Sequence, residues 1–211
     1  MERLHIKGSS HLADELKHLV YDAQTIGKPK ALYKVSFIDS KGKDDVVVDG
    51  IRLQSRVLRV NLEHPHRVFP FVATCGMELE EWASRIDDVL HRYWADKIKE
   101  MVLRLAMEVL KEHLIEHHRP GPISRMSPGS LADWPIQEQK VLFEILGNTK
   151  DAIGVQLTDS LFMIPTKSVS GIFFATEENF ESCQLCPREL CPGRKGAYDK
   201  DLYDRKYRKR T

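Results

Sequence analysis

The sequence lacks the features of membrane, secreted and nucleic-acid-binding proteins. No run among its 211 residues comes near the roughly 18 consecutive apolar residues that a membrane span needs, and the polar stretch 1–10 is not expected to be a signal peptide. Four unevenly spaced cysteines argue against a disulfide framework. The 32 Lys and Arg nearly balance 31 Asp and Glu, so no net field favours nucleic acid or a membrane. We expect a soluble, cytoplasmic protein that binds neither nucleic acid nor a membrane.

The order of helical and strand patterns predicts the fold class. Apolar residues at helical spacing predict helices over 11–26, 55–62, 78–118 and 135–146. Alternating apolar residues predict strands over 31–38, 45–49, 67–74, 154–157, 161–165 and 172–175. The stretch 78–118 is either one helix or two that meet at a bend near 91–94. Because helices and strands do not alternate as βαβ units, the sequence predicts a single α+β domain with an antiparallel or mixed sheet and long helices.

One loop, Arg125–Ser130, combines a fixed cation with a sharp turn. Pro128 fixes one backbone angle and Gly129 permits the left-handed one. The loop can present a guanidinium and bare amides to an anionic or zwitterionic ligand, since arginine offers a planar fork suited to carboxylates. Turn chemistry alone also explains such a loop.

A second loop, Pro165–Gly171, has almost no side-chain bulk. Its sequence Pro-Thr-Lys-Ser-Val-Ser-Gly lies between two predicted strands. A large flat ligand could therefore approach its backbone closely. Here too, an ordinary turn is the alternative interpretation.

The two loops and the segment between them resemble the activation domain of cobalamin-dependent methionine synthase. In that family an Arg-x-x-Pro-Gly-Tyr loop precedes a helix, and a later strand carries a Pro-x-x-Ser-Val-Ser-Gly loop. The matching positions here are Arg125, Pro128, Gly129, Pro165, Ser168, Val169, Ser170 and Gly171. The resemblance is strong over 125–174, fainter over 93–114, and favours two helices over 78–118. It is greater to stand-alone proteins of this group than to the domain fused to a full-length synthase.

The resemblance implies a function in methionine biosynthesis. Such a chain binds S-adenosylmethionine and docks on a corrinoid protein or on the methionine synthase core, where it supports reductive methylation of a shared cobalamin. The implied S-adenosylmethionine-binding residues are Arg125, Ser127, Pro128, Gly129 and Ser130. The implied corrinoid-facing residues are Lys167, Ser168, Val169, Ser170 and Gly171. The reduced cobalt is the nucleophile in this chemistry, so no catalytic side chain is required.

Two positions depart from the family pattern. Ser130 replaces the Tyr that normally follows Pro-Gly, and this removes a stacking or hydroxyl contact to the ligand. Arg104 stands in the long helix where the fused domain tends to have an acid. A rival interpretation follows from these changes: the chain could be a metal-binding electron-transfer or interaction module that keeps the fold and has lost S-adenosylmethionine.

Three cysteines lie close together near the C-terminus. Cys183, Cys186 and Cys191 form a Cys-x2-Cys-x4-Cys pattern whose short spacing lets the backbone wrap one ion. An iron–sulfur cluster or a zinc ion normally needs four ligands, and Cys75 is the proposed fourth, with a histidine or an exogenous ligand as the alternatives. We expect a metal centre, iron–sulfur rather than zinc. Redox-active or purely structural thiols are the alternatives.

The C-terminal segment divides the predicted organisation into two parts. Residues 1–180 are expected to form the activation-domain-like unit, and 181–211 the cysteine motif with a basic tail. Basic residues and tyrosines mixed over 194–210 can bind nucleic acid, but the aspartates among them oppose this. A solvated terminal helix is the preferred interpretation of this stretch.

Overall fold

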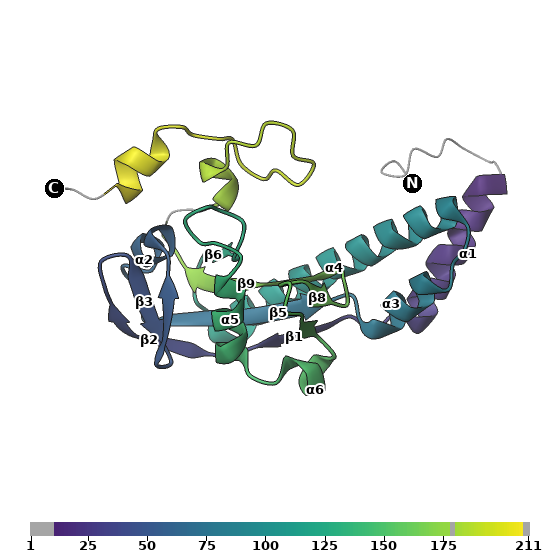
Figure 1. Ribbon diagram of the computed structural model, residues 1–211, viewed down its shortest axis with the longest axis horizontal. Coiled ribbons are helices and arrows are strands. Elements are labelled where there is room, and N and C mark those ends of the chain that lie inside the picture. Colours follow the sequence, from purple (N-terminus) through teal and green to yellow (C-terminus); the bar gives the residue numbers. More distant parts are fainter. Residues whose placement is uncertain (1–10, 178–179, 209–211) are drawn as a thin grey trace.

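The computed structural model describes residues 11–177 and 180–208 (Figure 1). Its centre is a seven-stranded sheet in the order β4-β3-β2-β5-β9-β6, with β1 paired to β5 next to β2. The strands are β1 Lys30–Tyr33, β2 Ser36–Lys41, β3 Asp45–Val48, β4 Ile51–Gln54, β5 Arg67–Thr74, β6 Ile123–Met126 and β9 Ser168–Ala175. Their pairings are antiparallel. Two short strands, β7 Gln156–Leu157 and β8 Met163–Ile164, form a separate pair.

Helices cover both faces of this sheet, which confirms the predicted α+β class. The helices are α1 His11–Ile26, α2 Arg56–Asn61, α3 Met77–Ser84, α4 Val89–His118, α5 Glu138–Leu146 and α6 Thr149–Ile153. Phe69 and Phe71 of β5 pack against Leu114 of α4 on one face. Val68 and Val72, at the alternate positions, belong to the larger core that contains α2 and α5. The central strand is therefore buried on both faces, which explains its nearly continuous apolar sequence.

An arm projects from one end of the sheet (Figure 1). It is formed by α1, α3 and the first half of α4, which share a small core that includes Leu16, Leu79 and Trp94. The break between α3 and α4 falls at residues 85–88, not near 91–94 as the sequence predicted. Asp88 begins α4, because its carboxylate accepts a 2.8 Å hydrogen bond from the backbone N–H of His91.

Several predicted elements have different bounds in the structure. The strand predicted over 31–38 is two strands, β1 and β2, which lie along the same edge of β5. The helix predicted over 135–146 begins at Glu138, and the sequence analysis missed β4, β6 and α6. The predictions for α1, α2 and β5 are confirmed, including Ser55 as the cap of α2, whose hydroxyl accepts from Leu58 N.

The C-terminal segment is packed onto the sheet domain. Tyr207 is fully buried in the larger core, and its hydroxyl donates a 3.0 Å hydrogen bond to Asn61 Oδ1 of α2. The Arg56 guanidinium donates to the carbonyl oxygen of Tyr207 at 3.0 Å. Phe180 and Leu202 also pack into this core. The prediction of a solvated terminal helix is therefore wrong at Tyr207.

Among the described residues, no helix is long and apolar enough to cross a membrane.

Candidate functional site

The two loops that the sequence singled out lie on neighbouring strands. β6 pairs with β9 so that Arg125 lies opposite Phe173 and Met126 opposite Ile172. The beginning of the first motif, at Met126 and Ser127, is thereby next to Gly171, the end of the second. Two segments about 40 residues apart in the chain are brought together by this pairing, as expected for parts of one site.

Gly171 makes the close approach of the two motifs possible. A Cβ atom at this position would lie 2.4 Å from the carbonyl oxygen of Met126 and 2.7 Å from Ser127 Oγ. Such contacts are far below van der Waals separation, so only glycine fits between the strands.

The prediction of a loop over Ser168–Gly171 is wrong. These residues are the first half of β9, where the strand pairs with β5. Ser170 is 3 % exposed and its hydroxyl accepts a 3.3 Å hydrogen bond from Gln139 Nε2 of α5. Ser170 and Gly171 are buried, and their contact with a corrinoid stays a prediction. The remaining implied corrinoid-facing residues, Lys167, Ser168 and Val169, are partly exposed.

Arg125 is a half-buried cation at the edge of the sheet. Its strand partner Phe173 belongs to the core beneath α4, so the side chain of Arg125 lies on that face. The guanidinium forms no hydrogen bond or ion pair with the residues that the structure describes. Burial lowers the pKa of Arg125, and the nearby Glu181 carboxylate opposes this shift. The group stays charged and its donors remain available to a ligand.

The turn after Arg125 is held closed by its own residues. Gly129 has a φ of 79°, and its N–H donates to the carbonyl oxygen of Trp134 at 2.8 Å. The Ser130 hydroxyl donates to the carbonyl oxygen of Ser127 at 2.6 Å. Pro128 is buried whereas Gly129 and Ser130 are exposed. The Ser130 side chain therefore fastens the turn and does not extend toward a ligand.

The loop that follows this turn is anchored to the sheet domain. Asp133 Oδ2 accepts hydrogen bonds from Ser55 Oγ at 2.5 Å and from Val57 N at 2.8 Å, at the start of α2. Trp134 is fully buried in the larger core. These contacts fix the backbone that carries the Pro-Gly turn, as a preorganised binding loop requires.

The turn before β9 is tied to the helical arm. Thr166 donates through its hydroxyl to Glu80 of α3 at 3.0 Å, and Lys167 Nζ lies 2.9 Å from Asp96 Oδ2 of α4. Glu80 also pairs with the nearly buried Lys99, at 3.1 Å. Lys167 is thus held at the junction of the arm and the sheet, with its charge partly compensated by Asp96.

The predicted metal centre is not formed in this structure. No three Cys, His, Asp or Glu side chains within residues 11–177 and 180–208 are grouped so that they could hold a metal ion. Cys75 is fully buried in the arm core beside Trp94, whereas Cys186 packs against the core of the sheet domain. The structure therefore does not bring Cys75 to the C-terminal cysteines as a fourth ligand.

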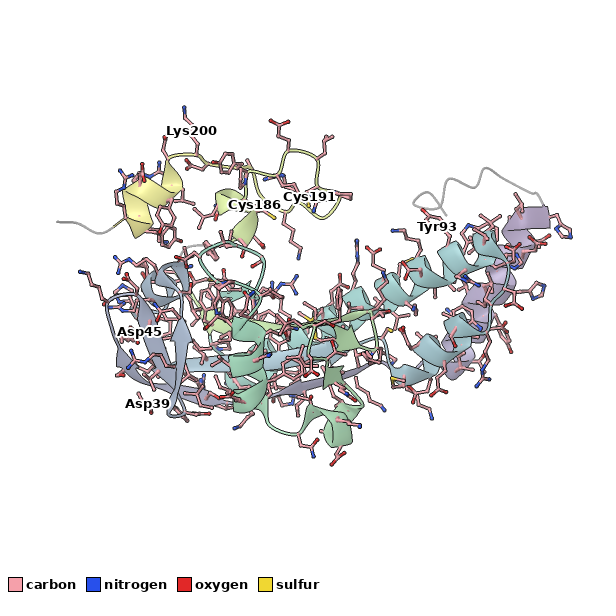
Figure 2. All side chains as sticks on the ribbon, in the orientation of Figure 1. Asp39, Asp45, Tyr93, Cys186, Cys191 and Lys200 are labelled. Atoms are coloured by element: carbon pink, nitrogen blue, oxygen red, sulfur yellow. The ribbon has the colours of Figure 1, made fainter. Side chains whose placement is uncertain are left out.

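The C-terminal cysteines instead lie on a loop organised by one arginine. Arg194 donates to the carbonyl oxygens of Cys183 at 3.1 Å, of Cys186 at 3.2 Å and of Arg188. Cys183 Sγ accepts a 3.4 Å hydrogen bond from Lys195 N. Figure 2 shows Cys186 and Cys191 on this loop, above the sheet and on the side toward the arm. A guanidinium thus performs the cross-linking that was predicted for a metal.

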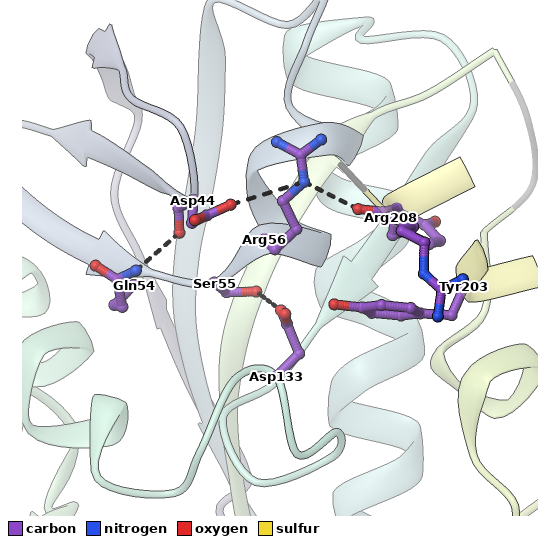
Figure 3. Close-up of a pocket in the computed structure, with 8 residues that line it drawn as sticks. Asp44, Gln54, Ser55, Arg56, Asp133, Tyr203 and Arg208 are labelled. Carbon is purple, nitrogen blue, oxygen red and sulfur yellow. Dashed lines mark hydrogen bonds and ion pairs between the residues drawn. The ribbon is translucent and has the colours of Figure 1, made fainter. Parts of the chain in front are cut away.

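A hollow of about 450 Å³ marks the joint between the C-terminal segment and the sheet domain (Figure 3). Its polar side chains contact one another: Arg56 lies 3.8 Å from Asp44, and Gln54 Nε2 donates to the carbonyl oxygen of Asp44 at 3.1 Å. Tyr203 and Arg208 of the C-terminal segment complete the wall. Because these groups hold the C-terminal segment against the sheet domain, we attribute the hollow to the packing of the fold and not to a ligand site.

Comparisons with known proteins agree with this arrangement. Residues 106–182 match the family model described as the activation domain of vitamin B12 dependent methionine synthase. The resemblance to the activation domain is confirmed. The matched segment contains both motifs of the activation domain, and it includes Glu181.

A solved structure shows the same fold. It is the crystal structure of the MetH reactivation domain bound to AdoHcy, with a TM-score of 0.62 and 17 % sequence identity over 82 % of this chain and 69 % of that chain. A comparison with curated proteins finds no match. The activation-domain fold therefore extends well beyond the 106–182 segment.

Glu181 is the residue near this site that the sequence analysis missed. Its field acts on Arg125, although the two are 56 residues apart in the sequence. It begins a short helical turn, Ser182–Leu185, and its own N–H donates to Gln184 Oε1 at 3.1 Å. No local motif points to Glu181, because a long-range contact, the 3.0 Å hydrogen bond from Phe180 N to Ser124 Oγ, helps to bring it here.

Proposed function

We propose that this chain binds S-adenosylmethionine beside Arg125 and supports reductive methylation of a cobalamin held by a corrinoid protein or by the methionine synthase core. The observation that carries the proposal is the state of Arg125. It is a half-buried cation that forms no hydrogen bond or ion pair with the described residues, in the segment that matches the activation-domain family. Burial of a cation is costly, the Glu181 carboxylate offsets only part of that cost, and a bound carboxylate would offset more of it.

The groups around Arg125 suit the charges of this ligand. S-adenosylmethionine, when bound, supplies a methyl group from its sulfonium, and the reduced corrinoid accepts it. Arg125 can bind the carboxylate of the ligand with two parallel N–H donors. The Glu181 carboxylate suits the ammonium group, and the exposed backbone of the Ser127–Ser130 turn suits the adenosyl part.

The proposed contribution of the protein is positioning. Holding the methyl donor and its acceptor in line turns an encounter of two molecules into a step within one complex. The anchoring of the Arg125 loop through Asp133 and Trp134 supports this view, since a fixed loop loses little freedom when the ligand binds. We assign the docking surface for the corrinoid protein to Lys167, Ser168 and Val169, which are partly exposed.

Calorimetry with S-adenosylmethionine tests the proposed site. Removing one partner of a buried charged pair costs roughly 2–5 kcal/mol, so Arg125→Ala should weaken binding at least tenfold. Arg125→Lys keeps the charge without the planar fork, so its affinity should lie between those of the native chain and Arg125→Ala. Arg52→Ala, at an exposed arginine of β4, is the matched control and should bind as the native chain does. No binding by the native chain, or equal binding by Arg125→Ala, would contradict the proposal.

A pull-down with a cobalamin-loaded corrinoid protein tests the docking surface. Lys167→Glu reverses a charge beside Asp96 and should reduce capture several-fold. Lys30→Glu, at a lysine on β1 that pairs with Glu78, is the control and should leave capture unchanged. Equal capture by both variants would remove Lys167 from the interface while leaving the calorimetric result on Arg125 unaffected.

A further inference from the structure

One face of α4 is apolar and has no partner among the described residues. Met101, Leu105 and Val109 are spaced by four residues, so they lie in a row along one side of the helix. They are 49 %, 58 % and 63 % exposed, on the side opposite Leu110 and Leu114, which pack on the sheet. Such a row normally packs into the grooves of another helix. Figure 1 shows α4 running from the arm along the sheet.

The charged residues beside this row complement the same residues of a second copy of α4 that runs antiparallel to the first. Arg104 and Glu108 lie on the same flank of the row, one turn apart. In an antiparallel pair centred on Leu105, Arg104 of one helix and Glu108 of the other are separated by only about 3 Å along the axis, at a rise of 1.5 Å per residue. The two-fold symmetry repeats this pair, so the flank provides two opposite-charge contacts.

The same reversal pairs other residues along the helix. Met101 faces Val109 across the centre, and Leu105 faces itself. Farther out, Lys97 comes to the level of Glu112. Within one copy, Glu108 and Glu112 form no ion pair with the described residues, whereas Lys97 and Arg104 share Glu100. A second copy would therefore supply cations to two acidic residues that lack them.

We propose that this face of α4 is the interface of a two-fold symmetric homodimer, in which the α4 helices of two copies cross antiparallel at Leu105. An interface with the same surface on both sides is the commonest arrangement of soluble oligomers. A single helix crossing buries little area, so the dimer is a transient one that dissociates on dilution.

Sedimentation equilibrium over a wide range of protein concentration tests the proposal. The native chain should show a reversible monomer–dimer equilibrium. Leu105→Glu places two charges at the centre of the contact and should weaken association at least tenfold. Leu12→Glu, at a 44 % exposed leucine of α1, is the matched control and should associate normally. Circular dichroism confirms that each variant keeps its helices.

A charge-reversal cycle tests the register. Arg104→Glu and Glu108→Arg each put like charges together and should each weaken the dimer. The double variant Arg104→Glu with Glu108→Arg exchanges the two signs and should restore it, because 104 contacts 108 of the other copy. A monomeric native chain at every concentration, or a double variant weaker than both single variants, would overturn the proposal. Loss of corrinoid-protein capture in Leu105→Glu, with a monomeric native chain, would assign the face to that partner instead.

Discussion

A Cβ atom on Gly171 would lie 2.4 Å from the carbonyl oxygen of Met126. This relationship joins the two motifs of the chain, because Met126 precedes the Pro-Gly turn and Gly171 ends the Ser-Val-Ser-Gly segment. The glycine is needed here for space and not for a left-handed backbone, since the φ angle of Gly171 is not positive. The position of the Arg125 loop relative to β9 therefore depends on a missing side chain.

We expect Gly171→Ala to destabilise the domain by about 1–3 kcal/mol or more, because the added methyl group overpacks a contact made with backbone. Urea denaturation measures the change. Gly196→Ala is the control, since a Cβ there meets its nearest neighbour, Gln184, at 3.4 Å, an ordinary contact. Equal stability of the two variants would show that the strands can move apart at Gly171.

Elements with a strong local pattern could be predicted from the sequence. The helix over 11–26 and the strand over 67–74 have the bounds that their apolar spacing indicated. Arg125 could be singled out from its motif. Its lack of a partner among the described residues could not, because that depends on every neighbouring side chain.

The errors arose where distant contacts decide the structure. Ser168–Gly171 consists of small residues, which are typical of loops, yet Ser170 is buried against Gln139 and Gly171 against Met126. Tyr207 lies among charged residues, and only its long-range contact with Asn61 shows that it belongs to the core. Local composition contains no signal for either contact.

We expect Tyr207→Ala to cost about 3–5 kcal/mol, the usual range for loss of a buried aromatic ring. Tyr207→Phe keeps the packing and removes the hydrogen bond to Asn61, worth about 1 kcal/mol. Tyr203→Ala removes a ring that is 41 % exposed, so it should destabilise the domain less than Tyr207→Ala does. If Tyr207→Ala has the same unfolding midpoint in urea as the native chain, the C-terminal segment does not stabilise the domain.

Stability should fall as the pH is lowered through the range where histidine becomes charged. Desolvation lowers the pKa of His118 from 6.5, and Arg67, His113 and His117 lower it further. Below pH 6.5 the unfolded chain therefore binds more protons at this residue than the folded chain does, so the contribution of His118 is complete above pH 6.5 and declines below it. Thermal unfolding between pH 8 and pH 5 measures this slope, and His118→Gln should make it shallower. An unchanged slope would contradict the assignment.

The four cysteines should divide into three reactive thiols and one that is protected. Cys75 is fully buried, and desolvation raises its pKa to about 11, so it holds almost no thiolate at neutral pH. Cys183, Cys186 and Cys191 are partly exposed on the loop around Arg194. A thiol reagent should therefore modify three groups in the folded chain and the fourth only after denaturation.

The same titration distinguishes free thiols from a metal centre. Cys75→Ser should leave three rapidly modified thiols, whereas Cys186→Ser should leave two. If the three C-terminal thiols resist modification until a chelator is added, then a metal binds them and the loop around Arg194 rearranges to bring their sulfurs together. Rapid modification without a chelator leaves Arg194 as the group that holds this loop, and the thiols as free side chains on the surface of the activation-domain fold.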